Sequence, residues 1–179
     1  MMNKESAVEV LKVVDWNRVF QTIHSSDGLK RNQTRPLRTE FVEKSIEKRS
    51  KGKLKYTGDK TDGMDYINNP DDGTRYECKL MHGIWRKCGI TPKIILKNFR
   101  KNSKSEIKKT FDYMILVDSK NKKVGLCTFE DLNIYVNDAT IECNVLQEKI
   151  VTITDNITID ESDTTDFEKI IMDSIIHYL

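Results

Sequence analysis

The sequence predicts a single domain of mixed α/β (α+β) class, in which helices come first, a mixed central sheet follows and another helix closes the chain. The length of 179 residues suits one domain, and a hydrophobic content of 37% is enough for a core. Apolar residues recur at helical spacing before residue 50, whereas short β-rich segments begin near residue 53. Separate runs of helices and strands favour a layered fold.

The first predicted helix spans residues 6–24, and Ser6 is its expected N-cap. Its apolar residues are distributed almost all round the helix, with Trp16 and Phe20 on one side and Leu11 on the other. A helix of this kind is covered on more than one side. Two interpretations are open: the second cover is another subunit, or the helix lies inside its own domain.

A second helix is expected from about residue 36 to residue 49, because Pro36 suits a first helical turn. Its apolar side consists of Leu37, Phe41, Val42 and Ile46. Three glutamates, Glu40, Glu43 and Glu47, lie opposite that side and are expected to form a solvated face.

The strands are expected in the β-rich segments that follow. They span residues 53–58, 63–68, 74–81, 93–99, 111–118, 123–129, 139–145 and 150–154. A polar turn at 118–123 joins two of them, and a final helix is expected at 164–179, with a capping box from Thr165 to Glu168.

Several classes of protein are disfavoured. No run of 18 apolar residues occurs, so no membrane span is expected, and the first residues lack the pattern of a secretory signal. Four cysteines without a Cys-x-x-Cys pair are typical of reduced thiols, which predicts a cytoplasmic protein without a disulfide or zinc framework.

Charge is distributed unevenly along the chain. Residues 30–109 carry 22 Lys and Arg against 10 Asp and Glu, whereas residues 124–179 carry 2 against 12. This division favours one basic working surface and an acidic part that lies away from a polyanion.

The segment "TDGMDYINNPDDGTRYECKLM", residues 61–81, predicts a β-hairpin closed by "NNPDDG". Glu77 and Lys79 are two residues apart on a strand and therefore share a face. Asp65 is expected on the partner strand, roughly opposite Glu77. Two carboxylates would then meet beside one ammonium group.

Two convergent carboxylates favour Mg²⁺, which prefers oxygen ligands and also binds phosphate oxygens. A metal ion beside a lysine is suited to hydrolysis of a phosphodiester. The alternative is an ordinary surface hairpin with a cross-strand ion pair between Lys79 and a carboxylate. The apolar neighbours of the motif and the positive charge around it favour the catalytic interpretation.

Asp65 followed by Glu77-Cys78-Lys79 resembles the signature of the PD-(D/E)XK nucleases, in particular type II restriction endonucleases of the PvuII-like group. The strand "YECK" is similar to the Tyr-Glu-x-Lys strand of that group, and "TPKIILK" at 91–97 is similar to a later strand. The resemblance covers about residues 60–130 and implies a restriction-endonuclease-like fold. Asp71, in the literal Pro-Asp of the turn, is the alternative first acid.

The resemblance also implies roles for particular residues. Asp65 and Glu77 would bind the metal, the backbone carbonyl of Cys78 would add a ligand, and Lys79 would assist the nucleophile. Asp62, three residues before Asp65, would hold a second ion or a water. Some members use a helix glutamate, for which Glu43 is the candidate.

Residues after the motif are the candidates for contact with DNA. Their side chains hydrogen-bond base edges, stack on bases or contact phosphates. They are His82, Trp85, Arg86, Lys87, Lys93, Lys97, Arg100, Lys101 and Lys104. Polar surface is the alternative for His82, and ordinary core is the alternative for Trp85.

The sequence therefore predicts a type II restriction endonuclease that cuts double-stranded DNA with Mg²⁺. The single nuclease domain, 1–179, would contain a helical part (1–50), a catalytic and recognition part (53–130) and an acidic part (131–179). A homodimer is expected, because one site cuts one strand, with Trp16, Phe20 and Ile23 in the interface. The alternatives are a Holliday junction resolvase and a non-catalytic DNA-binding regulator.

Overall fold

A computed structural model describes residues 3–26, 31–57, 67–96, 109–138, 140–160 and 162. The helices are α1 (Lys4–Lys12), α2 (Trp16–Ser26) and α3 (Arg31–Lys48). The strands are β1 (Lys55–Tyr56), β2 (Ile67–Asn68), β3 (Arg75–Met81), β4 (Ile94–Ile95), β5 (Tyr113–Asp118), β6 (Lys123–Thr128), β7 (Asn133–Asn137), β8 (Thr140–Asn144) and β9 (Val151–Thr154).

The strands form two sheets. A six-stranded sheet has the order β1-β2-β3-β5-β6-β9, in which β3 and β5 are parallel and all other neighbours are antiparallel. A three-stranded antiparallel sheet has the order β4-β8-β7. The larger sheet is thus mixed, as the sequence predicts, and the chain has the expected mixed α and β composition.

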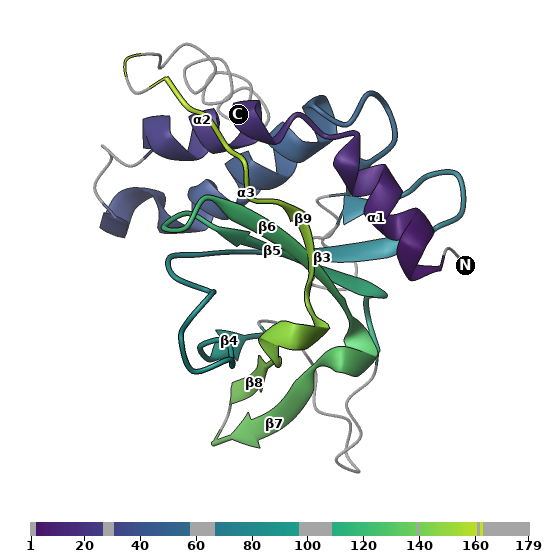
Figure 1. The fold of residues 1–179 in the computed structure, drawn as a ribbon, viewed down its shortest axis with the longest axis vertical. Coiled ribbons are helices and arrows are strands. Elements are labelled where there is room, and N and C mark those ends of the chain that lie inside the picture. Colours follow the sequence, from purple (N-terminus) through teal and green to yellow (C-terminus); the bar gives the residue numbers. More distant parts are fainter. Residues whose placement is uncertain are drawn as a thin grey trace.

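The two faces of the six-stranded sheet have different covers (Figure 1). The three helices cover one face, where Tyr76, Cys78 and Ile115 belong to the same core cluster as residues of α1, α2 and α3. The small sheet covers the other face, where Met114 and Leu116 pack in one core cluster with buried residues of the small sheet. The expected flanking helices are therefore found on one face, and a second sheet covers the other within the described residues.

The first helix differs from its prediction because it is divided. Asn3, and not Ser6, caps α1: the Asn3 Oδ1 atom accepts the Ser6 amide at 2.8 Å. The helix ends at Lys12, and Asp15 starts the next one by accepting the Arg18 amide at 3.3 Å. Asp is a favoured N-cap residue, so this break had a signal in the sequence.

The division explains why apolar residues surround the 6–24 segment. With a break between them, α1 and α2 can each turn a different face toward the core, so Leu11 is buried from one helix and Trp16, Phe20 and Ile23 are buried from the other. The interpretation that the helix lies inside its own domain is therefore the correct one. An interface built from Trp16, Phe20 and Ile23 is wrong, because a single chain already buries them.

The third helix also differs from its prediction. It begins at Arg31, so Pro36 lies inside it and not in its first turn. Phe41, Val42 and Ile46 are buried as expected. However, Glu40 and Glu43 are only 9% and 5% exposed, which contradicts the expected solvated face. Packing of α3 against α2, β1 and β3 covers more than one side of it.

Each of the eight expected segments contains a strand, and among the described residues these strands are shorter than expected. The structure adds β7, which was not predicted from the sequence, and its partner β8 brings part of the acidic segment 131–179 against β4. The expected final helix at 164–179 lies outside the described residues. None of the helices within the described ranges is long and apolar enough to cross a membrane.

Candidate active site

Strand β3 carries the predicted Glu-x-Lys pair in the interior of the six-stranded sheet. The hairpin turn before it is confirmed: Asn69 and Thr74 close it by a 2.8 Å backbone hydrogen bond, and Gly73 has the positive φ of 77° that glycine tolerates. Along β3, Tyr76 and Cys78 face the helices. Glu77 and Lys79 therefore share the opposite face, toward the small sheet.

The Lys79 ammonium group is held at two points. Its Nζ atom lies 3.5 Å from Glu77 Oε1 and donates a hydrogen bond of 2.9 Å to the carbonyl oxygen of Ile95 in β4. The Glu77 and Lys79 side chains are 13% and 19% exposed. Such a largely buried pair is more strongly coupled than a fully exposed surface ion pair. The ion pair of the alternative interpretation is thus present, in a half-buried site.

The small sheet forms the floor of this site. Cys143 of β8 pairs with Ile94 of β4 and is buried. Burial raises the pKa of the Cys143 thiol to about 12, the Lys79 charge lowers it and the Glu77 charge raises it. The thiol is therefore protonated at neutral pH and acts as a packing group below the charged pair.

Only some of the proposed metal ligands lie in the described residues. Among these residues, no group of three or more His, Cys, Asp or Glu side chains could hold a metal ion. Glu77 offers a carboxylate, and Cys78 can offer only its carbonyl, because its thiol is buried on the helix side and burial raises the pKa of that thiol. Asp62 and Asp65 lie outside the described residues. The donors that remain are oxygen atoms, the type that Mg²⁺ prefers.

The two alternative acids have distinct positions. Asp71 is exposed in the turn, and its amide is bound to Asn69 Oδ1 at 3.0 Å, at the end of β3 opposite Lys79. Glu43 is buried on α3, where its charge helps to raise the pKa of Cys78. Since the Cys78 side chain faces the helices, Glu43 approaches β3 from the face opposite Glu77 and Lys79.

The predicted DNA-contacting residues divide into three groups. Arg86 and Lys87 are exposed, and so is His82, whose Nδ1 atom lies 3.1 Å from Ser119 Oγ. Lys93 is exposed, but its Nζ atom lies 3.6 Å from the buried Glu142 carboxylate. Lys97, Arg100, Lys101 and Lys104 lie outside the described residues.

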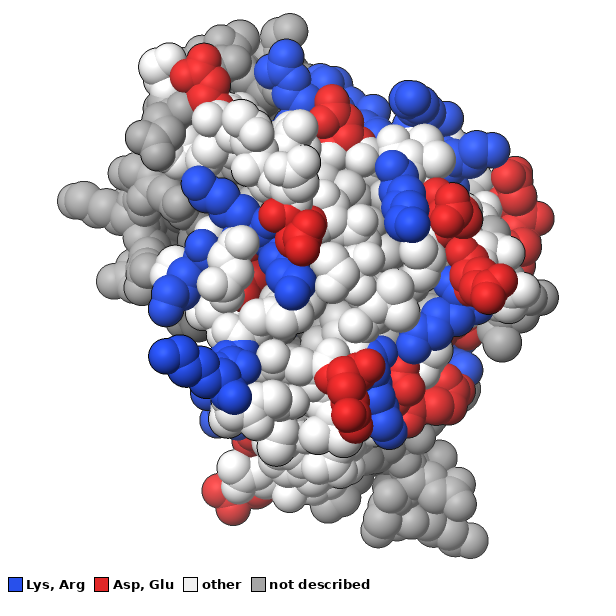
Figure 2. Space-filling model, viewed as in Figure 1, with Lys and Arg blue, Asp and Glu red and all other residues white. Residues whose placement is uncertain are grey.

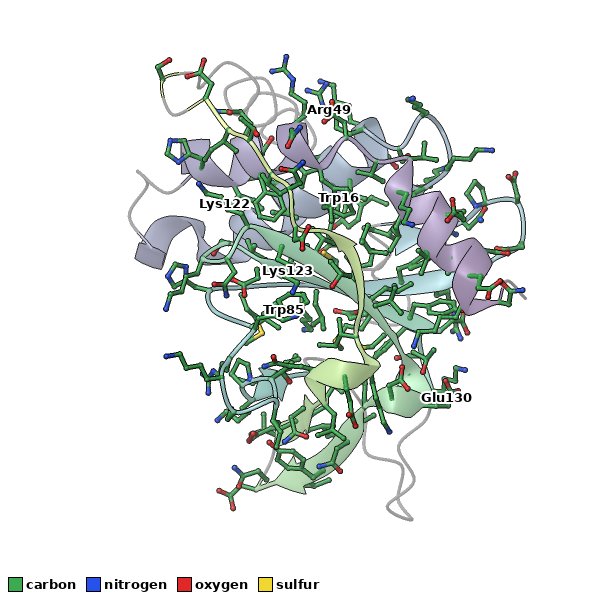
Figure 3. All side chains as sticks on the ribbon, viewed as in Figure 1. Trp16, Arg49, Trp85, Lys122, Lys123 and Glu130 are labelled. Atoms are coloured by element: carbon green, nitrogen blue, oxygen red, sulfur yellow. The ribbon has the colours of Figure 1, made fainter. Side chains whose placement is uncertain are left out.

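Trp85 is a packing residue and also part of a surface. Its side chain is half-buried and packs against the core cluster that lies between the two sheets. The Lys123 Nζ atom lies over the Trp85 ring, 4.7 Å from its centroid (Figure 3). The ring lies over Gly125 of β6, where an added Cβ would be 2.9 Å from a ring carbon. The position of Trp85 therefore requires a residue without a side chain at 125.

The contact between Lys79 and Ile95 was not predicted from the sequence. No pattern in the sequence marks it, because the acceptor is a backbone carbonyl that a separate sheet brings to the lysine. The role of Asp118 was not predicted either. This residue is fully buried at the end of β5 and accepts backbone hydrogen bonds from Gly83, Ile84 and Trp85 at 2.9, 2.7 and 3.1 Å. Its position before the "SKNKK" turn was its only signal.

No family model, curated protein or solved structure matches this chain. The geometry of the site and the sequence motif on β3 are therefore the evidence for its function.

Proposed function

We propose that this chain is a Mg²⁺-dependent endonuclease of the restriction type, which hydrolyses phosphodiester bonds in double-stranded DNA at a short site. One observation carries the proposal: Glu77 and Lys79 are held side by side, half-buried, on an interior strand of a mixed sheet. The resemblance of "YECK" to the PD-(D/E)XK signature and the basic sequence around it support the same function.

Glu77 and Lys79 have different roles in the proposed reaction. Bound Mg²⁺ supplies Lewis-acid activation and neutralises charge on the phosphate. Glu77 and the Cys78 carbonyl, together with Asp65, would hold the ion. Lys79 orients the attacking water and stabilises the negative charge that develops on the phosphate, and its contact with Ile95 keeps the ammonium in position.

The first prediction concerns metal and substrate. The purified chain should convert plasmid DNA to discrete fragments with Mg²⁺, and EDTA should abolish the reaction because the chemistry requires the ion. Gel electrophoresis of the products measures both effects. A synthetic four-way junction serves as the second substrate: a junction cut in preference to linear duplex indicates a resolvase. DNA binding without any cutting indicates a regulator and contradicts the proposal.

A second prediction concerns the assembly. Each chain offers one Glu-x-Lys hairpin among its described residues, so we propose that two copies act together on the two strands. Sedimentation at micromolar protein should give about twice the single-chain mass of 20.8 kDa. A single-chain mass together with double-strand cutting would contradict the dimer. Since α1 and α2 bury their apolar faces internally, the interface must lie elsewhere.

A further inference from the structure

One buried carboxylate joins two loops at the same end of the main sheet. Besides the amides of Gly83, Ile84 and Trp85 in the loop after β3, Asp118 accepts hydrogen bonds from the turn that follows it. The turn donors are the Lys120 amide, at 2.9 Å, and the Asn121 amide and side chain, at 3.1 and 2.7 Å. We call residues 82–89 and 119–123 together the two-loop platform.

The hydrogen bonds make the platform rigid. Burial alone would raise the pKa of Asp118, but hydrogen bonds from Asn121, Gly83 and Trp85 outweigh burial and lower it. The carboxylate is therefore charged at neutral pH and holds both loops by charge-assisted bonds. In Figure 1 the loop after β3 and the turn between β5 and β6 lie side by side at the left of the molecule.

The platform presents positive charge to solvent. Apart from the fully buried Asp118 that joins them, the two segments contain no Asp or Glu. Their positively charged side chains, each exposed or half-exposed, are Arg86, Lys87, Lys120, Lys122 and Lys123. Figure 2 shows basic side chains along this side of the molecule, and Figure 3 shows Lys122 and Lys123 above Trp85. A rigid basic surface with few acids is suited to a polyanion.

The chain segment that follows β3 connects the platform to the candidate active site, because both ends of this segment lie near Lys79. Strand β3 ends two residues after Lys79. The chain then passes Arg86 and Lys87 and returns to the Lys79 ammonium at Ile95. Seven residues of extended chain reach at most about 25 Å, so Arg86 lies within that distance of Lys79. One turn of duplex DNA is about 34 Å long. The distance from Lys79 to Arg86 is therefore shorter than one turn of a duplex.

We propose that the two-loop platform binds the phosphate backbone of duplex DNA, on the same helical turn as the phosphate that is cut. The position of the cut phosphate rests on the proposed function, whereas binding by the platform does not. The new elements are the turn lysines Lys120, Lys122 and Lys123 and the role of Asp118 in fixing them beside Arg86 and Lys87.

The test compares two matched double variants. The platform variant is Lys120→Gln with Lys122→Asn, because Asn tolerates the φ of 51° at residue 122, and Lys123 stays because it contacts Trp85. The control is Lys53→Gln with Lys51→Asn, in the turn between α3 and β1, where residue 51 has a φ of 53°. Binding of a short labelled duplex is measured by fluorescence anisotropy over a range of KCl concentrations, with EDTA to prevent cutting.

In the platform variant, the slope of log K against log salt should become shallower by about one to two units, because two phosphate contacts are lost. The control should keep the wild-type slope. An unchanged slope in the platform variant, or a wild-type chain that does not bind duplex DNA, would overturn the inference. A reduced slope in a chain that never cuts DNA would leave the platform standing and reject the nuclease function.

Discussion

Replacing Lys79 with alanine should reduce DNA cleavage by about 100-fold or more, while binding of duplex DNA in EDTA changes little. The expected loss is that of a positioned group which stabilises charge in the transition state, where one such group contributes about 10²–10³ in rate. Ground-state affinity comes mainly from many phosphate contacts, so removal of one half-buried ammonium has a small effect on it. Single-turnover cleavage and anisotropy measure the two quantities separately.

Two further variants make this prediction specific. Lys79→Met keeps the aliphatic stem that packs in the site and removes the charge, so it should lose activity as Lys79→Ala does. Lys55→Ala, at an exposed position on β1, should cut at the wild-type rate. Thermal melting of all three shows whether they fold. A folded Lys79→Ala chain that cuts normally would show that the pair is the structural ion pair of the alternative interpretation.

The sequence was most informative where local patterns and tertiary packing agree. The hairpin turn at 69–74 and the alternation along β3 are both local, so Glu77 and Lys79 could be placed on one face without a structure. The polar turn between β5 and β6 was predictable for the same reason.

Prediction failed where the outcome depends on what packs against a segment. Glu40 and Glu43 are polar and were expected in solvent, yet α3 is covered on more than one side. The apolar residues on all sides of the 6–24 segment left open whether another subunit or the same domain covers it, because a break at Asp15 was not considered. Strand β7 was missed because "NIYVN" is short and has asparagine at both ends, a residue that is depleted in strands.

The part of the site that the small sheet forms could not be predicted from the sequence. The β4 carbonyl that fixes Lys79 and the β8 thiol below the pair come from segments distant in the sequence, and only the pairing of β4 with β8 brings them there. The same holds for Asp118, because three of its backbone donors, in the loop after β3, lie more than 30 residues earlier. A single polar residue at a strand end does not identify its partners.

Replacing Asp118 with asparagine should lower the free energy of unfolding by about 2–4 kcal/mol. Hydrogen bonds to a buried charged group contribute about 1.5–3 kcal/mol, and donors left without an acceptor add a desolvation cost. An asparagine of the same shape turns an NH₂ group toward amides that need an acceptor. For a chain of this length, the melting temperature should fall by about 5–15 °C. Asp155→Asn, at an exposed position after β9, is the control and should melt within about 1 °C of the wild type.

The effect of Asp118 should depend on pH in one direction. Because its folded pKa is below the ordinary value of 3.8, its contribution to stability is fully present above that value and is lost as the pH falls through the folded pKa. The difference in the free energy of unfolding between the wild type and Asp118→Asn should therefore be constant from neutral pH to about pH 5 and shrink in stronger acid.

Hydrogen exchange of the Gly83, Ile84 and Trp85 amides supplies a local measurement. Exchange at these amides should be faster in Asp118→Asn, even when denaturant is used to give both proteins the same global stability. Unchanged exchange at these three amides would show that the two loops are held by other contacts, and the platform would then lack the rigidity attributed to Asp118.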